Sequence, residues 1–294
     1  MRPGPLVSIV TPSLNMGSFI EETICSTLDQ DYPHIQYMVV DGGSTDGTIE
    51  ILERYGGRLK YISEPDRGQA HAVNKGFQMT QGSIFTFLNA DDTLLPGAVT
   101  AAVEAFASNA EVGVIYGNAW HMSGDSARIG PYPVEKYDPE RFARRCFICQ
   151  PAAFIRREAF ADVGMLDTHL HYALDYDLWI RFARLYPMKK IDAFLAASRL
   201  HAQSKTVGQT GRALEETLRT LSRHYGYVPC NWLYGYCHHR LTGQCLASEP
   251  PKLSALSASL AIALGARYNW RSPARYCRDI IQTTRQGLNL IMGD

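Results

Sequence analysis

The sequence has no long uninterrupted apolar segment. No stretch reaches the roughly 18 consecutive apolar residues that a helix needs to cross a bilayer, so we expect no membrane-spanning helix. The first residues, Met1 to Pro5, lead directly into a strand-like run and contain no apolar core of an export signal. Together these absences predict a cytoplasmic protein.

The chain also has no net charge, and its cysteines show no pattern that is typical of disulfide bonds. Lys and Arg number 29 and Asp and Glu number 29, so the charge balance gives no argument for nucleic acid as a partner, and we expect none. The seven cysteines are odd in number and scattered, which favours a reduced protein without disulfides. The spacing of Cys230, Cys237, His238, His239 and Cys245 fits no usual pattern of zinc ligands, so we expect no zinc site there.

The two common phosphate-binding fingerprints, GxGxxG and GxxxxGK[ST], also occur nowhere in the chain. A nucleotide could still bind the loop from Asp41 to Thr48, which holds three glycines around Asp41 and Asp46. Asp41 can accept hydrogen bonds from a base edge or a ribose. For Asp46 we expect that the carboxylate caps the next helix.

What the sequence does contain is an alternation of buried strands and helices. Helical spacing follows each of four strand-like runs, at residues 6–11, 36–40, 59–62 and 84–88. This order predicts an α/β fold with a parallel, doubly wound sheet, and further strands are expected at 112–119, 150–155 and 191–199. Each of the first four strands ends in polar or glycine-rich residues. Because such strand ends meet at one edge of the sheet, we expect a single site there.

The last third of the chain is helical in pattern. We therefore predict a sheet domain over residues 1–207 and a helical extension over 208–294. Within the extension, residues 274–291 carry arginines on one side and apolar residues mostly on another: Arg275, Arg278 and Arg285 against Cys277, Ile280, Ile281, Leu288 and Ile291. An apolar helix at 253–264 precedes it. Such a basic amphipathic helix can lie on a membrane surface, or its apolar stripe can pack on the sheet domain.

Asp91 and Asp92 follow the strand-like run that ends at Leu88. Two adjacent carboxylates repel each other unless a positive charge lies beside them, and Asp oxygens are natural ligands of hard divalent cations. Alternatively, the pair caps the helix expected from Leu94 onward. The two residues alone leave both interpretations open.

Five segments in this order resemble the motifs of family-2 glycosyltransferases: 7–15, 39–48, 64–76, 88–92 and 175–181. The resemblance covers roughly residues 6 to 207. It implies a GT-A fold, in which helices flank a mainly parallel, Rossmann-like sheet. It also implies an inverting enzyme that uses a nucleotide-diphosphate sugar as donor.

The resemblance also implies roles for individual residues. For the nucleotide and donor it points to Thr11, Pro12, Asn15, Asp41, Asp66, Arg67, Gly68, Asn89 and Ala90. Asp91 lies in the segment that resembles the family's Asp-x-Asp metal motif, and His201 falls where some members supply another ligand. The implied cofactor is a divalent metal, Mn²⁺ or Mg²⁺. Asp175 falls at the position of the catalytic base.

Two departures from the family pattern affect these roles. The metal motif begins with Asn89 instead of Asp, so Asp91 must provide most of the coordination. The base motif is commonly Glu-Asp and is Leu174-Asp175 here, which leaves Asp177 as a rival for the base.

The chemistry of sugar transfer asks for the same groups. A cation held by Asp91 would stabilise the leaving diphosphate, and Asp175 would take the proton of the attacking hydroxyl. Arg67 would lie near phosphate or pair with Asp66 or Glu64. The acceptor implied by the family is a growing polysaccharide or a lipid-linked glycan.

Two other functions have less support in the sequence. A nucleotidyltransferase would need a glycine-rich loop with Lys or Arg after the first strand, and residues 11–17 contain neither cation. A sugar-nucleotide-binding or scaffold protein without catalysis has only Asn89 and Leu174 in its favour.

Overall fold

The computed structural model of the chain describes residues 4–201, 204, 208–243 and 251–292, without the side chains of 251–254 and 284–292. It divides into two compact units. The sheet unit comprises Met1–Asp138 and Phe147–His201, and the helical unit comprises Pro139–Cys146 and Ala202–Asp294. The short helix α5 (Pro139–Arg144) therefore belongs with the C-terminal helices, far from it in sequence.

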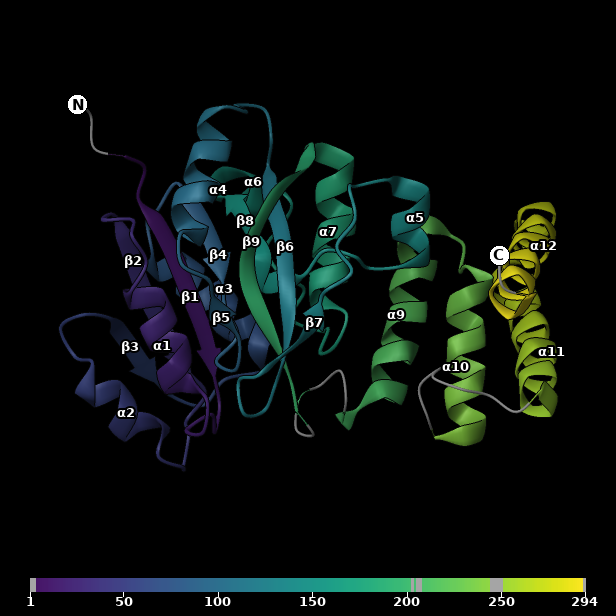
Figure 1. Cartoon of the computed structure of the whole chain (residues 1–294), viewed down its shortest axis with the longest axis horizontal. Coiled ribbons are helices and arrows are strands. Elements are labelled where there is room, and N and C mark those ends of the chain that lie inside the picture. Colours follow the sequence, from purple (N-terminus) through teal and green to yellow (C-terminus); the bar gives the residue numbers. More distant parts are fainter. Residues whose placement is uncertain (1–3, 202–203, 205–207, 244–250, 293–294) are drawn as a thin grey trace. The chain divides into compact units, whose positions relative to one another are not determined.

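The sheet unit contains nine strands within the described residues, in the order β3-β2-β1-β4-β8-β6-β9-β5, with β7 paired to β6 (Figure 1). Their bounds are β1 Val7–Ser13, β2 Ile35–Asp41, β3 Lys60–Ser63, β4 Ile84–Phe87, β5 Thr93–Leu94, β6 Val114–Ser123, β7 Arg128–Pro131, β8 Ala153–Arg156 and β9 Met188–Leu200. The first four pair in parallel, as expected for strands separated by helices. β8 lies antiparallel between β4 and β6. The predicted α/β fold is thus confirmed, but the sheet is mixed, because β5, β7 and β8 pair antiparallel with their neighbours.

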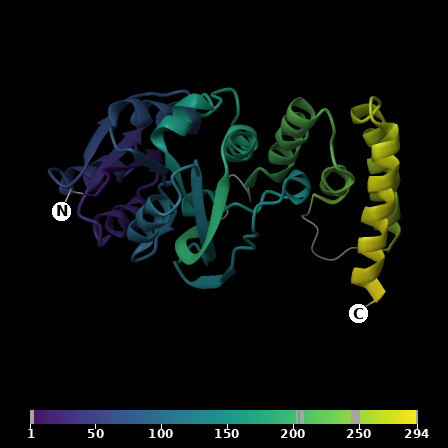
Figure 2. The same ribbon diagram turned by 90° about the horizontal axis from the view of Figure 1, so that it is seen from above.

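Helices flank this sheet (Figures 1 and 2). They are α1 Ile20–Leu28, α2 Thr48–Arg54, α3 Gln69–Met79, α4 Ala98–Ala107, α6 Arg157–Asp162 and α7 Leu174–Leu185. α3 lies very close to the sheet because Gly76 faces it. A Cβ atom at Gly76 would lie 2.4 Å from Val10 Cγ1 and 3.1 Å from Val40 Cγ2. Any larger residue would push α3 away from β1 and β2, whose carboxyl ends carry predicted site residues.

Within its described residues, the helical unit contains α5 and four longer helices: α9 Thr210–Tyr225, α10 Cys230–Thr242, α11 Pro251–Tyr268 and α12 Pro273–Met292. Its buried polar centre is Asp279 on α12. The carboxylate accepts hydrogen bonds from Tyr227 Oη (2.5 Å) and the Cys230 N–H (2.6 Å), and it forms an ion pair with Arg144 of α5. These contacts tie α5 to α12. No helix in the described part of the chain is long and apolar enough to cross a membrane.

Candidate active site

The candidate site lies at the carboxyl edge of the sheet. β1, β2 and β4 run parallel, so the loops that follow Ser13, Asp41 and Phe87 emerge at the same edge. β9 pairs with β5 immediately after the Asp91-Asp92 turn, Thr93 opposite Ala197. This pairing brings the end of β9, and His201 after it, next to the carboxylates that follow β4.

Asp91 and His201, which are far apart in sequence, face each other at this edge. His201 Nε2 lies 3.0 Å from Asp91 Oδ2, and the side chains are only 8% and 16% exposed, respectively. The ring of Phe19 packs on the imidazole with ring centres 4.6 Å apart. A carboxylate oxygen and an imidazole nitrogen side by side fit two positions of an Mn²⁺ or Mg²⁺ ion, which commonly takes its other ligands from phosphate and water. No group of three potential ligands occurs among the described residues.

Asp92 is buried and turned away from this pair. Its Oδ1 accepts the Arg199 N–H (2.9 Å) and its Oδ2 accepts the Asn89 amide (3.0 Å). Burial, followed by the negative charge of Asp91, raises the pKa of Asp92 to about 8. The alternative that Asp91 and Asp92 cap a helix is wrong. β5 follows them directly, and α4 begins only after Gly97, with no side-chain cap.

Asn89 uses both ends of its amide. Its Oδ1 accepts a hydrogen bond from Gln69 Nε2 (2.6 Å), while its Nδ2 donates to Asp92 and, at 3.4 Å, to Gln150 Oε1. An ionised aspartate could not donate to Asp92 and would add a negative charge beside Asp91. The departure from Asp-x-Asp therefore has a structural reason. Ala90 is buried, and its carbonyl accepts the Thr23 hydroxyl (2.9 Å).

Arg199, near the end of β9, is a buried cation that sequence analysis missed. Its Nε donates to the Asp91 carbonyl (2.7 Å) and its Nη1 donates to Ser126 Oγ (2.8 Å) and, at 3.2 Å each, to the carbonyls of Ser123 and Gly124. Its Nη2 forms an ion pair with Glu22 of α1 at 2.5 Å. One side chain thus joins the Asp91 turn to α1 and to the β6–β7 hairpin. Its only sequence signal is a charge that closely follows the apolar run 194–197 of β9.

We expect Arg199→Met to lower the free energy of unfolding by about 2–5 kcal/mol, because the carbonyls of Asp91, Ser123 and Gly124 would lose the donor that the buried guanidinium supplies. Urea unfolding measures this change. Arg128→Met is the matched control, since Arg128 is an exposed arginine on β7 in the same unit. Equal stability losses in the two variants would show that the Arg199 contacts contribute little.

The loops after β1 and β2 hold each other in place. Asp41 is fully buried, and its carboxylate accepts the N–H groups of Gly43 (3.0 Å) and Ser44 (2.8 Å) and the hydroxyls of Ser44 (2.5 Å) and Ser63 (2.7 Å). Asn15 Oδ1 accepts the Thr45 N–H (2.9 Å). Asn15 itself is exposed and has a positive φ of 53°. Its amide is therefore within reach of a ligand.

Asp46 accepts a hydrogen bond from the first residue of α2, although the N-cap position itself is Gly47. Its Oδ1 accepts the Thr48 N–H (3.0 Å) and its Oδ2 accepts the Gly17 N–H (2.9 Å). Burial raises the pKa of Asp46, but the hydrogen bonds from Thr48 and Gly17 outweigh it, and the net pKa is lowered.

Thr11 and Pro12 are buried within β1. The Thr11 hydroxyl lies 3.1 Å from the Tyr37 hydroxyl on β2, and both side chains belong to the interior. Thr11 and Pro12 can therefore contribute to a nucleobase pocket only through the shape that they give to the loop after β1. That role stays a prediction.

The Asp66-Arg67-Gly68 loop contacts the loop after β2. A Cβ atom at Gly42 would lie 3.2 Å from Asp66 Oδ2, so the two loops touch. Asp66 Oδ1 accepts the N–H of Gly68 (2.7 Å), which has a φ of 102° that favours glycine. Arg67 is exposed, and within the described residues it forms no ion pair, while Glu64 pairs with Lys75. This leaves the Arg67 guanidinium available to an anionic ligand.

The two candidates for the catalytic base, Asp175 and Asp177, lie in different environments on α7. Asp177 is fully buried and accepts a hydrogen bond from Arg181 Nε one helical turn later (2.8 Å). Asp175 is half-buried, and its Oδ1 accepts the Tyr176 N–H (2.8 Å). Of the two carboxylates, only that of Asp175 is accessible to a substrate.

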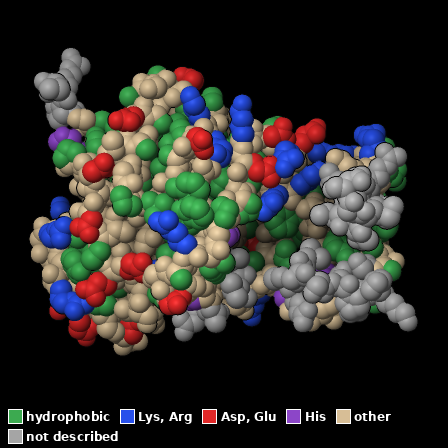
Figure 3. Space-filling model, viewed as in Figure 1, with side chains coloured by type: hydrophobic (Ala, Val, Ile, Leu, Met, Phe, Trp, Pro, Cys, Tyr) green, Lys and Arg blue, Asp and Glu red, His purple; other side chains and the backbone are tan. Residues whose placement is uncertain are grey.

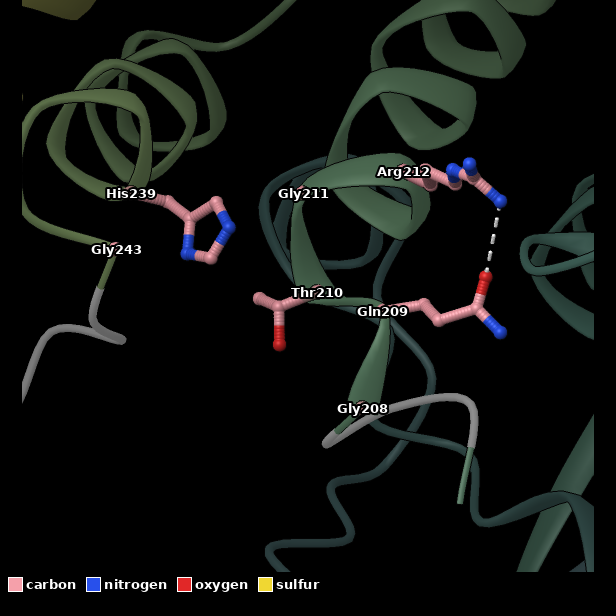
Figure 4. Close-up of a pocket in the computed structure, with 7 residues that line it drawn as sticks. All are labelled: Gly208, Gln209, Thr210, Gly211, Arg212, His239 and Gly243. Carbon is pink, nitrogen blue, oxygen red and sulfur yellow. Dashed lines mark hydrogen bonds between the residues drawn. The ribbon is translucent and has the colours of Figure 1, made fainter. Parts of the chain in front are cut away.

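The cavity drawn in Figure 4 belongs to the helical unit and holds none of these residues. Its volume is about 660 Å³, and it is lined by Gly208, Gln209, Thr210, Gly211, Arg212, His239 and Gly243. The structure brings no three potential ligands among Cys230, Cys237, His238 and His239 together as a metal site, and Cys245 lies outside the described residues.

Comparison with known proteins gives a consistent result. Residues 8–164 match the family model described as "Glycosyl transferase family 2". An uncharacterized glycosyltransferase of Rickettsia prowazekii is 30% identical over 210 residues, 69% of this chain and 66% of the relative. A PGL/p-HBAD biosynthesis glycosyltransferase of Mycobacterium bovis is 31% identical over 182 residues, 60% of this chain and 69% of the relative. The chain spans only 39% of a Rickettsia conorii relative.

Two solved structures share the fold. One is the mannosyltransferase PcManGT of Pyrobaculum calidifontis in complex with GDP-Man and Mn²⁺, with a TM-score of 0.58 at 19% identity. The match covers 98% of this chain and 81% of the PcManGT chain. The other is S. aureus TarS 1–349 in complex with UDP-GlcNAc, with a TM-score of 0.61 at 17% identity. The match covers 96% of this chain and 92% of the TarS chain.

Proposed function

The chain belongs to glycosyl transferase family 2, and on that basis we propose that it moves a sugar from a nucleotide-diphosphate donor to a hydroxyl of a glycan or a lipid-linked acceptor, with inversion at the anomeric carbon. The observation that carries the proposal is the Asp91–His201 pair at the carboxyl edge of the sheet, beside the loops that hold Asp41 and Asp66. Ligands in open α/β sheets bind at this edge.

Asp91 and His201 would hold a divalent cation, Mn²⁺ or Mg²⁺, which supplies Lewis-acid stabilisation of the leaving diphosphate. The PcManGT complex with GDP-Man and Mn²⁺ supports this part of the proposal by likeness of fold. Arg67, exposed and without an ion pair in the described part of the chain, would add positive charge near phosphate. Asn15 would contact the nucleoside, and Asp41, whose carboxylate is fully buried, would hold the shape of the neighbouring loop.

Asp175 would take the proton from the acceptor hydroxyl as it attacks the anomeric carbon. A single in-line displacement needs one base, and Asp175 is the accessible carboxylate on α7. Asp177 would instead fix the helix through Arg181. A glycan or lipid-linked acceptor fits a location in the cytoplasm, peripheral on the inner face of the membrane, and this location stays a prediction.

A donor screen tests the proposal. In thermal unfolding with Mn²⁺, we expect one nucleotide sugar to raise the midpoint by about 5 °C or more at a concentration near 100 times its dissociation constant. The shift should fall sharply when the metal is chelated. The same mixture with an acceptor should release nucleoside diphosphate. Binding without release under all acceptors would favour a scaffold protein, and no shift with any donor would contradict the proposal.

A further inference from the structure

Helix α11 turns its small residues inward. Ser257, Ala261 and Gly265 recur every fourth residue, which places them on one side of the helix, and all three are buried. Tyr276 of α12 lies against them: its hydroxyl donates to the Ala261 carbonyl (2.9 Å), and a Cβ atom at Gly265 would overlap the tyrosine ring. The side chains on the inner side of α11 are therefore small, which leaves room for Tyr276.

The large apolar residues of α11 lie on its outer side instead. Leu256, Leu260 and Ile262 are 47%, 42% and 44% exposed. Among the residues of α11 whose side chains are described, the other exposed ones are Ala255, Ser259, Ala263, Ala266 and Arg267. A helix that faces water normally shows the opposite arrangement, with polar residues outward. The outer side of α11 thus suits contact with an apolar phase.

Arginines and a tryptophan border this apolar side. Trp270, in the turn between α11 and α12, is 68% exposed, and the guanidinium of Arg271 lies 4.8 Å from its ring centre. Arg267, Arg275 and Arg278 are exposed as well. The sequence from 251 to 292 contains a single acid, Asp279, which is buried and paired with Arg144. The exposed charge of this surface is therefore positive.

By contrast, acidic and basic side chains are interspersed over the face of the sheet unit seen in Figure 3. The difference extends to the sequence: residues 202–294 contain 11 Lys and Arg but five Asp and Glu, although the whole chain is balanced at 29 each. The positive charge is concentrated in the part of the chain that also carries the exposed apolar helix.

We propose that the outer side of α11, with Trp270 and the bordering arginines, docks on an anionic lipid bilayer. Apolar side chains that enter the headgroup region, arginines that meet anionic lipid and an interfacial tryptophan are the combination that holds a helix in the plane of a membrane. No described helix can span the bilayer, so the contact is superficial. A second copy of the chain fits less well, because pairing two such surfaces would bring arginines together.

This surface differs from the stripe predicted from sequence. On α12, Tyr276 and Asp279 face the interior, whereas Cys277 and Ile281 are exposed beside Arg278. The side chains of Arg285, Leu288 and Ile291 lie outside the described residues.

Vesicle flotation of the full chain tests the proposal without any donor or acceptor. We expect flotation with vesicles that contain phosphatidylglycerol, strong at low salt and weak at high salt, and little flotation with phosphatidylcholine alone. Leu260→Glu combined with Ile262→Glu should lower the partition coefficient at least about tenfold. Arg267→Gln, Arg271→Gln and Arg278→Gln together should lower it about hundredfold and remove most of the salt dependence.

Ile129→Glu is the matched control, because Ile129 is an apolar residue of β7 that is 60% exposed in the sheet unit. It should float like the unmodified chain. A blue shift of tryptophan emission on vesicle addition, lost in Trp270→Phe, reports the contact independently of how the glutamate variant folds. The proposal is overturned if the full chain does not float, if the glutamate variant floats equally well, or if light scattering shows a dimer that only the glutamate substitutions dissociate. Sugar transfer to a water-soluble acceptor should persist in all these variants.

Discussion

Asp175→Asn is expected to lower kcat by at least about 100-fold while the dissociation constant of the donor stays nearly unchanged. The side chain keeps its size and its place at the start of α7, but the amide cannot accept the proton of the acceptor hydroxyl. Because the base acts on the acceptor, donor binding should not depend on it. Steady-state kinetics and donor titration of the same preparation measure the two quantities.

Asp177→Asn is the informative comparison, since it makes the same chemical change two residues away. There we expect a loss of stability, because Arg181 would lose the charge of its buried partner. The kcat of the remaining folded protein should stay within a few-fold of the original. If Asp177→Asn loses turnover while Asp175→Asn keeps it, the base is Asp177 and the assignment made here fails.

The sequence could not distinguish these two aspartates. Residues two apart on a helix point to nearly opposite sides, so one of them had to face the interior, but no local pattern says which. The decisive contact, from Arg181 to Asp177, lies within one helical turn and could have been considered from the spacing. The burial of Asp177 depends on the packing around α7 and could not be predicted from the spacing.

The carboxyl edge of the sheet was predictable for a different reason. β1, β2 and β4 are short apolar runs that end in polar residues, and both the run and its end are local features. The insertion of β8 between β4 and β6 is not local, because it joins strands that are far apart in sequence. The same holds for Arg199, whose partners come from α1, the Asp91 turn and the β6–β7 hairpin.

Asn89 shows most clearly what the sequence alone could not predict. From sequence it is a departure from the Asp-x-Asp metal motif, and with Leu174 it was the only support for the alternative of a protein without catalysis. In the structure its amide donates to Asp92 and accepts from Gln69, two contacts that a carboxylate could not make together. The residue thus orders the turn from which Asp91 projects, and of the three residues in the motif only Asp91 would be left to bind a metal.

Asp91→Ala is therefore expected to abolish metal-dependent donor binding and to lower turnover by roughly 1,000-fold or more, since a bound cation contributes several kcal/mol to charge stabilisation and each 1.36 kcal/mol is a factor of ten. Asp92 cannot take over the role. Its oxygens accept hydrogen bonds from Arg199 and Asn89, and its burial disfavours the charged form that a cation needs. His201 alone would supply one neutral nitrogen, too little to hold Mn²⁺ or Mg²⁺ without the carboxylate.

Calorimetric titration of Mn²⁺ into protein with nucleoside diphosphate, together with initial rates, measures both effects of Asp91→Ala. Asp192→Ala is the control, because Asp192 is a fully exposed carboxylate on β9 of the same unit, and we expect its titration and rates to match the unmodified chain. His201→Ala should weaken metal binding by less than Asp91→Ala, since a neutral ligand is lost and the charge remains. If Asp91→Ala turns over at the normal rate in the presence of a chelator, Asp91 has no role in holding a metal, and the stabilisation of the leaving diphosphate must come from the chain's own cations, Arg67 first among them.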